Sequence, residues 1–159
     1  YGQLDWKIRS DERVKTIERT NLKNCAFEEI YSENEPIADL LVSDLSFISL
    51  TKVLPNLKNL LSPDFHEMIL LIKPQFEAGK EKVEKGGVVR DKKVHQEVIE
   101  NVINCAKELN YSINDLTFSS IKGPSGNIEY LIWLSSHNEN KATLDIKNIV
   151  ETAFEILNK

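Results

Sequence analysis

The sequence predicts an α/β fold in which a mostly parallel sheet carries one antiparallel strand. Residues Met68 to Ile72 form an unbroken apolar run, which is typical of a strand covered on both faces. A strand, a helix and this second strand follow one another in βαβ spacing, which predicts a parallel pair with a right-handed crossover. The short turn at Gly123 to Gly126 leaves no room for a crossover helix, so the last strand should be antiparallel.

The first third of the chain is predicted to hold two strands and little helix. Leu4 to Ile8 can form one or two helical turns, which are too short to be stable alone. Val14 to Glu18 is predicted to be a short strand, and Ala38 to Leu45 a second, largely apolar one. Ser46 to Ser49 then turns into a helix, whose apolar face consists of Leu50, Val53, Leu54, Leu57 and Leu61.

The second half alternates helices and strands. Asp91 is expected to cap a helix, and the apolar face of that helix consists of Val94, Val98, Val102, Ile103, Ala106 and Leu109. Ile113 to Ser119 and Asn127 to Leu134 are predicted strands. A closing helix is predicted from its apolar stripe, which contains Ile146, Ile149, Val150, Ala153 and Leu157.

Length and composition limit the classes of protein that fit. The 159 residues, 18.2 kDa, suit one domain with a real core. The net charge of -5 argues against a surface that binds nucleic acid by charge alone, and the apolar runs are too short to span a bilayer. Cys25 and Cys105 are expected to be free thiols, as in the reducing cytoplasm. The chain opens at Tyr1 without a methionine or targeting pattern, so we interpret it as a fragment.

Three charged residues lie on otherwise apolar strands: Asp44, Lys73 and Glu129. Asp44 and Lys73 should lie at the carboxyl edge of the parallel pair, where open α/β sheets bind their ligands. An antiparallel last strand begins at that edge, so Glu129 should arrive beside them. The three form a candidate active site, and a purely structural salt-bridged cluster is the alternative.

The segment from Ala78 to Lys93 has no periodic pattern and contains the basic residues Lys80, Lys82, Lys85 and Arg90. It is either a solvated loop or a flexible basic lid over an anionic substrate. The three histidines lack the spacing of metal ligands, so no metal site is predicted.

Four motifs taken together resemble one family. They are Ser43-Asp44-Leu45-Ser46-Phe47-Ile48-Ser49, Ile72-Lys73-Pro74-Gln75-Phe76-Glu77, Lys85-Gly86-Gly87-Val88-Val89-Arg90-Asp91 and Gly123-Pro124-Ser125-Gly126-Asn127-Ile128-Glu129. From Tyr1 to about Leu134 the chain resembles the TlyA, or hemolysin A, family of FtsJ-like methyltransferases. The resemblance implies a Rossmann-like methyltransferase sheet that lacks its first strands. It divides the chain into a partial methyltransferase domain at 1–140 and, at 141–159, the C-terminal helix of the same domain.

The resemblance also implies an activity. The donor would be S-adenosylmethionine, and the acceptor a ribose 2′-hydroxyl of ribosomal RNA, free or in a ribosomal subunit. Asp44, Lys73 and Glu129 match the last three members of the family's Lys-Asp-Lys-Glu tetrad, and the first lysine would precede Tyr1. Asn21 would lie near the adenine of the cofactor and Asp44 near its reacting end. The glycine-rich first strand would also be missing, so we expect the fragment to be inactive alone.

Two alternative functions and a homodimer also have to be considered. A membrane-active hemolysin and a non-catalytic RNA-binding module are the alternative functions. The sequence opposes the first, since it has no apolar span and no helix with an apolar face opposite a basic one. The resemblance also implies that the strand ending near Asp44 has an open edge. Either the strand at Val14 to Glu18 covers this edge, or a second copy of the chain does, as a homodimer.

Overall fold

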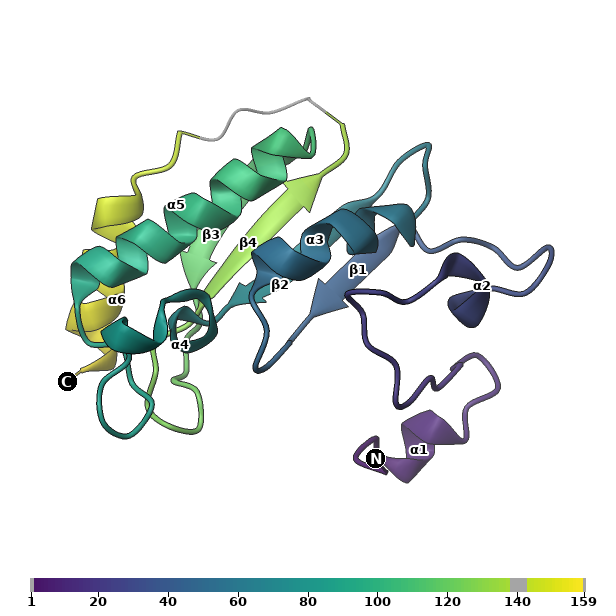
Figure 1. Ribbon diagram of the computed structural model, residues 1–159, viewed down its shortest axis with the longest axis horizontal. Coiled ribbons are helices and arrows are strands. Elements are labelled where there is room, and N and C mark those ends of the chain that lie inside the picture. Colours follow the sequence, from purple (N-terminus) through teal and green to yellow (C-terminus); the bar gives the residue numbers. More distant parts are fainter. Residues whose placement is uncertain (1, 138–142, 159) are drawn as a thin grey trace.

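Four strands form one sheet in the computed structural model, which describes residues 2–137 and 143–158 (Figure 1). In chain order they are β1 (Leu40–Ser43), β2 (Glu67–Ile72), β3 (Ser112–Phe118) and β4 (Tyr130–Ser135), and in the sheet their order is β1-β2-β4-β3. β1 and β2 pair in parallel, whereas β4 is antiparallel to both β2 and β3. Three strands therefore share one direction and β4 opposes them, which confirms the predicted fold class.

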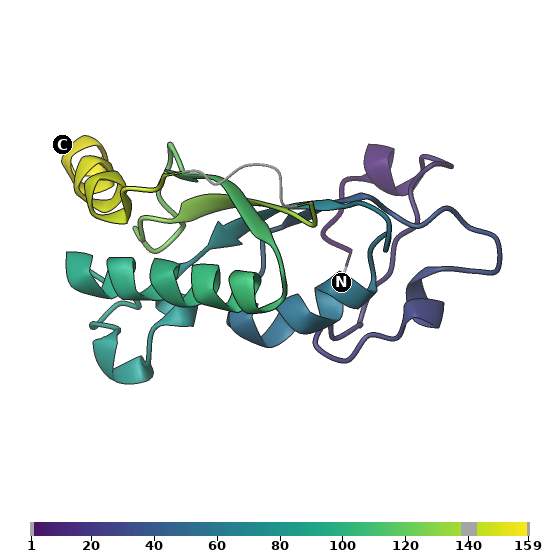
Figure 2. The ribbon, with the colours of Figure 1, turned by 90° about the horizontal axis from the view of Figure 1, so that it is seen from above.

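Two helices cover one face of the sheet. α3 and α5 lie side by side against this face, and α6 packs against α5 and β3 (Figures 1 and 2). Their bounds and those of the shorter elements are α1 (Trp6–Arg9), α2 (Phe27–Ile30), α3 (Leu50–Asn59), α4 (Pro74–Glu77), the 3-10 helix η1 (Lys80–Lys82), α5 (Lys92–Glu108) and α6 (Ile146–Leu157). The predicted helices are thus confirmed, with Ser49 and Asp91 as the caps of α3 and α5.

The core lies between the sheet and the pair α3 and α5. Alternate residues of the two central strands point into it and are fully buried: Met68, Leu70, Ile72, Tyr130, Ile132 and Leu134. On the opposite face Ile69 is 38% exposed and Trp133 is 41% exposed. The prediction that β2 is covered on both faces is therefore wrong for this chain, because α3 and α5 lie on the same side.

A proline inside α3 is compensated by the neighbouring helix. Pro55 has no N–H to donate to the carbonyl of Thr51, four residues earlier. The Cys105 thiol of α5 lies 3.8 Å from that carbonyl oxygen and donates to it. Both Cys105 and Cys25 are free thiols, as predicted.

The predicted strand at Val14 to Glu18 is wrong. Residues 14–18 form no strand, and the Glu18 carboxylate accepts hydrogen bonds from Gly2 N (3.0 Å) and Arg9 Nη1 (3.1 Å). These contacts tie the segment to α1 and its N-terminal side, so it does not pair with the sheet. β1 is consequently an edge strand, and its Leu40 and Val42 side chains are exposed.

Candidate active site

Asp44 and Lys73 meet at the carboxyl edge of the sheet, as the strand directions predicted. Each residue directly follows its strand, because β1 ends at Ser43 and β2 ends at Ile72. The Lys73 ammonium lies 2.5 Å from Asp44 Oδ1 and donates to Ser46 Oγ at 3.1 Å. Lys73 is 9% exposed, whereas the Asp44 side chain is 74% exposed. The pair therefore joins a buried cation to a carboxylate that faces solvent.

Glu129 reaches the same edge but is held by a different partner. β2 and β4 pair Ile72 with Tyr130, so continuing the register by one residue sets Lys73 opposite Glu129. The Glu129 carboxylate is buried and accepts from Gln75 Nε2 at 2.9 Å. In the part of the chain that the structure describes, no ion pair joins Glu129 to Lys73. The structure thus gathers the three predicted residues at one edge and adds Gln75, which the sequence analysis did not single out.

Gly123 makes room for the Glu129 side chain. A Cβ atom at this glycine would lie 2.6 Å from Glu129 Oε1, which is closer than carbon and oxygen can approach. The absence of a side chain at Gly123 therefore leaves room for the Glu129 carboxylate, which Gln75 holds in place.

Phe47 is a second site residue that sequence reasoning missed. Its φ of +63° lies in the left-handed region, which is uncommon for a bulky residue. Its side chain is 89% exposed, and its ring centroid lies 4.8 Å from that of Phe76. An exposed aromatic ring beside the Asp44 and Lys73 pair offers a flat surface on which a nucleobase could stack.

The basic loop (residues 78–93) is braced rather than free. Asn127, only 1% exposed, accepts from Val89 N (3.0 Å) and donates to Gly87 O (2.8 Å). Two of the four basic residues that the sequence analysis names in this loop are paired with acids: Lys82 with Glu97, and Arg90 with Glu84 at 2.7 Å. All four, Lys80, Lys82, Lys85 and Arg90, are exposed. The loop is therefore held at Gly87 and Val89, near the strand that follows Glu129, and it carries four exposed basic side chains, two of them ion-paired.

A cavity of about 690 Å³ runs along the free edge of β1. Its lining includes Asp44, Ser43, Leu22 and Tyr31. Ser43 Oγ is buried and has no hydrogen-bond partner among the described residues. Asn21, the predicted adenine contact, is exposed beside Leu22 and accepts a hydrogen bond from Lys23 N. The two predicted cofactor residues therefore lie at or next to one cavity.

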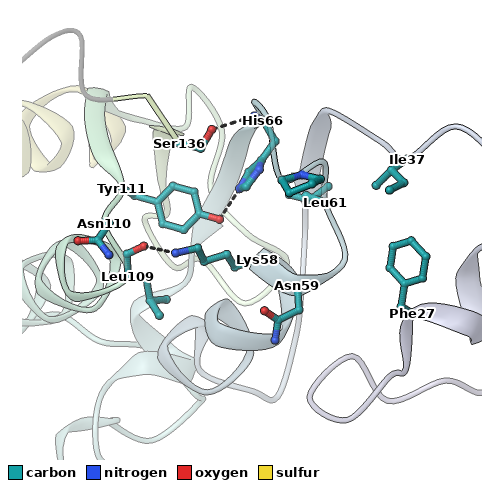
Figure 3. Close-up of a pocket in the computed structure, with 11 residues that line it drawn as sticks. Phe27, Ile37, Lys58, Asn59, Leu61, His66, Leu109, Asn110, Tyr111 and Ser136 are labelled. Atoms are coloured by element: carbon teal, nitrogen blue, oxygen red, sulfur yellow. Dashed lines mark hydrogen bonds between the residues drawn. The ribbon is translucent and has the colours of Figure 1, made fainter.

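A second cavity, of about 520 Å³, lies near the start of β2 and β3, where His66 and Tyr111 directly precede these strands (Figure 3). His66 contacts Ser62 O at 2.6 Å through Nδ1 and the Tyr111 hydroxyl at 2.5 Å through Nε2, while Lys58 donates to Leu109 O at 2.7 Å. His66, Tyr111 and Lys58 each have a hydrogen-bond partner within the chain. These polar side chains therefore have structural roles and do not indicate a ligand site.

Comparison with known proteins decides the family. Residues 1–136 match the family described as FtsJ-like methyltransferase. The chain belongs to this family. It is 40% identical to YqxC of Bacillus subtilis, provisionally named an rRNA methyltransferase, over 99% of this chain and 56% of YqxC. It is 42% identical to the 16S/23S rRNA (cytidine-2′-O)-methyltransferase TlyA of Mycobacterium tuberculosis, over 87% of this chain and 50% of TlyA.

A solved structure shows the same fold in a similar protein. A Lactococcus lactis protein, provisionally described as a hemolysin, superimposes with a TM-score of 0.85 at 42% identity, covering 94% of this chain and 71% of that one. These matches confirm the resemblance to the TlyA and hemolysin A proteins. The chain spans about half the length of the curated relatives it matches. In the described residues, no helix is both long enough and apolar enough to cross a membrane.

Proposed function

We propose that the protein carrying this chain transfers a methyl group from S-adenosylmethionine to a ribose 2′-hydroxyl of ribosomal RNA, in the cytoplasm. The observation that carries the proposal is the buried Lys73, paired with Asp44 at the carboxyl edge of an FtsJ-like sheet. The names of the TlyA relatives support the acceptor class. Asp44, Lys73 and Glu129 are the proposed catalytic residues, and the four exposed cations of the basic loop are the proposed RNA contacts.

The cavity along β1 fits part of the proposed cofactor. Its volume of about 690 Å³ is in the range of small-molecule sites, and its lining includes Ser43, whose buried Oγ has no hydrogen-bond partner among the described residues. Asp44 would hold the reacting end of S-adenosylmethionine and Asn21 would lie near the adenine. When bound, the cofactor supplies an electrophilic methyl group on a sulfonium.

The protein groups have orienting roles in this proposal. Methyl transfer depends chiefly on alignment of the acceptor oxygen with the departing sulfur. The Lys73 ammonium has three N–H donors, of which two face Asp44 and Ser46, so the third is available to the acceptor hydroxyl. Glu129, fixed by Gln75, would face the same hydroxyl from the β4 side and orient it.

Replacing the lysine tests the proposal. Lys73→Ala in the native protein should abolish methylation of ribosomal RNA and leave S-adenosylmethionine binding nearly intact, since the lysine faces the acceptor. Lys107→Ala, at an exposed position of α5, is the matched control and should keep the wild-type rate. A Lys73→Ala protein with most of its methylation rate would overturn the assignment.

Two other functions predict different results. The hemolysin names of relatives favour a membrane-active protein, which would release dye from liposomes without any cofactor. A non-catalytic RNA-binding module would bind ribosomal RNA with the same affinity in the presence and absence of S-adenosylmethionine, and would show no methyl transfer.

The exposed edge of β1 also suggests how this chain assembles. Unpaired N–H and C=O groups together with the exposed Leu40 and Val42 make β1 a template for another strand. We propose that the isolated 159-residue chain forms a homodimer through this edge. Sedimentation should then show a dimer that Val42→Lys converts to a monomer, whereas a monomeric wild-type chain would contradict the proposal.

A further inference from the structure

Glu77 is a half-buried carboxylate that has no direct part in the proposed reaction. It is the last residue of α4, and it accepts two hydrogen bonds from the start of α3: Ser49 Oγ donates to Oε2 at 2.6 Å and Leu50 N to Oε1 at 2.7 Å. Burial raises the pKa of Glu77, while these two hydrogen bonds and the charge of Lys52 act in the opposite direction. Burying a carboxylate is costly unless donors compensate for the lost water, and here two donors do so.

The contacts of Glu77 complete a ring that includes the candidate active site. The site loop (residues 44–49) connects β1 to α3, and α4 directly follows Lys73. At one end Asp44 meets Lys73, and at the other Ser49 meets Glu77. Between them the Phe47 ring packs on Phe76. The start of the site loop is therefore tied to the residue that precedes α4, and the end of the loop is tied to the last residue of α4.

Capping of α3 does not by itself explain this carboxylate. Ser49 already caps the helix, because its Oγ accepts from Thr51 N at 3.2 Å. Glu77 instead accepts a hydrogen bond from Ser49, the last residue of the site loop, and a second one from Leu50 N, the first N–H of the helix. The shape of the loop, with Phe47 in a strained left-handed conformation, needs such an outside constraint to persist.

We propose that Glu77 is a positioning residue for methyl transfer, because it fixes the site loop so that Asp44 and Ser46 meet Lys73. The inference rests on the proposed function and adds to it a residue that touches neither substrate nor cofactor. It predicts that the reach of the side chain matters more than its charge.

Three substitutions in the native protein separate reach from charge. Glu77→Gln keeps the length, since its carbonyl oxygen can accept from Leu50 N while its amide donates to Ser49 Oγ. Glu77→Asp keeps the charge but is one methylene too short, and Glu77→Ala lacks both. We expect kcat to fall about 10- to 100-fold in the Asp and Ala variants, with KM for ribosomal RNA unchanged, and to stay within about threefold in the Gln variant.

Hydrogen–deuterium exchange provides a measurement that does not depend on activity. Exchange of the peptide covering residues 44–51 should rise about tenfold in the Asp and Ala variants, because the loop opens locally. Val98→Ala is the matched control: Val98 is buried in α5, so its truncation lowers overall stability but should leave both kcat and exchange of this peptide unchanged.

The outcomes separate the two proposals. Unchanged exchange in Glu77→Ala, a Gln variant as impaired as Ala, or an equal loss of kcat in Val98→Ala overturns the role of Glu77. A wild-type protein that transfers no methyl group overturns the proposed function and with it the positioning role of Glu77 in methyl transfer, while the exchange data still decide whether Glu77 holds the site loop.

Discussion

Asn127→Ala is expected to lower the stability of the chain markedly for a single polar substitution. The side chain is 1% exposed and links the basic loop to the turn before β4 through Val89 N and Gly87 O. Without it the Val89 N–H stays buried with no acceptor, since Val89 is itself 2% exposed. Such an orphaned donor costs about 1–3 kcal/mol. The Gly87 carbonyl belongs to an exposed residue and can turn to water, so it adds little.

The expected loss is therefore about 2 kcal/mol of unfolding free energy. For a chain of this size that corresponds to a decrease in Tm of about 4–8 °C. Urea titrations followed by far-ultraviolet circular dichroism measure the loss, and thermal scans give the shift. Asn127→Asp should lose less than Asn127→Ala, because a carboxylate still accepts from Val89 N although it has no donor for Gly87 O.

Asn59→Ala is the matched control. Asn59 is exposed on α3, so its substitution should change the unfolding free energy by less than about 0.5 kcal/mol. If Asn127→Ala also stays within that range, or if both variants lose equal stability, the bridge between the basic loop and the turn contributes nothing and the reasoning is refuted.

The other predictions concern RNA binding, catalysis and pH. Reversing Lys82, Lys85 and Arg90 to Glu should weaken RNA binding and reduce the slope of log K against log salt by about 2, as for three lost contacts to a single strand; an unchanged slope would make the basic loop a bystander. Glu129→Gln should lower the methylation rate less than the lysine substitution does, and an unaltered rate would leave Glu129 a purely structural role. Burial lowers the pKa of His95, so below about 6.5 the unfolded chain binds a proton that the folded chain excludes. Stability should therefore fall between about pH 7.5 and about pH 5.5, and His95→Gln should lose less over this interval in urea titrations; equal losses would contradict this.

The pairing of Asp44 with Lys73 could be predicted because it depends on strand direction alone. Both residues follow apolar strands joined by a helical crossover, and parallel strands end at one edge of a sheet. The strand at Val14 to Glu18 could not be judged in this way. Its residues have ordinary strand character, but a strand needs a partner, and Glu18 instead bonds to Gly2 and Arg9. Local residue preference therefore predicts a strand here, but it carries no information about whether a partner strand is present.

The sequence does not reveal the residues that support the site, because the motifs that contain them are also consistent with ordinary structural roles. A proline such as Pro74 indicates the end of a strand in the sequence, but in the structure it also begins α4, and that helix places Gln75 against Glu129. A phenylalanine such as Phe47 is usually expected in the core. Its exposure follows from a left-handed backbone conformation that no sequence pattern predicts. Asn127 follows a glycine-rich turn and was interpreted as the start of a strand, although its amide acts as a bridge between two segments.

The antiparallel direction of β4 has a consequence for how the chain folds. β3 and β4 are close in sequence and can pair early as a hairpin, whereas β2 and β4 are separated by the basic loop, α5 and β3. Pairing over such a separation carries the larger loop-closure cost and tends to form late. It is this ladder that sets Lys73 opposite Glu129. Refolding experiments that follow activity alongside circular dichroism should show helix and hairpin signals returning first, and any function of this pair only when the last strands have joined.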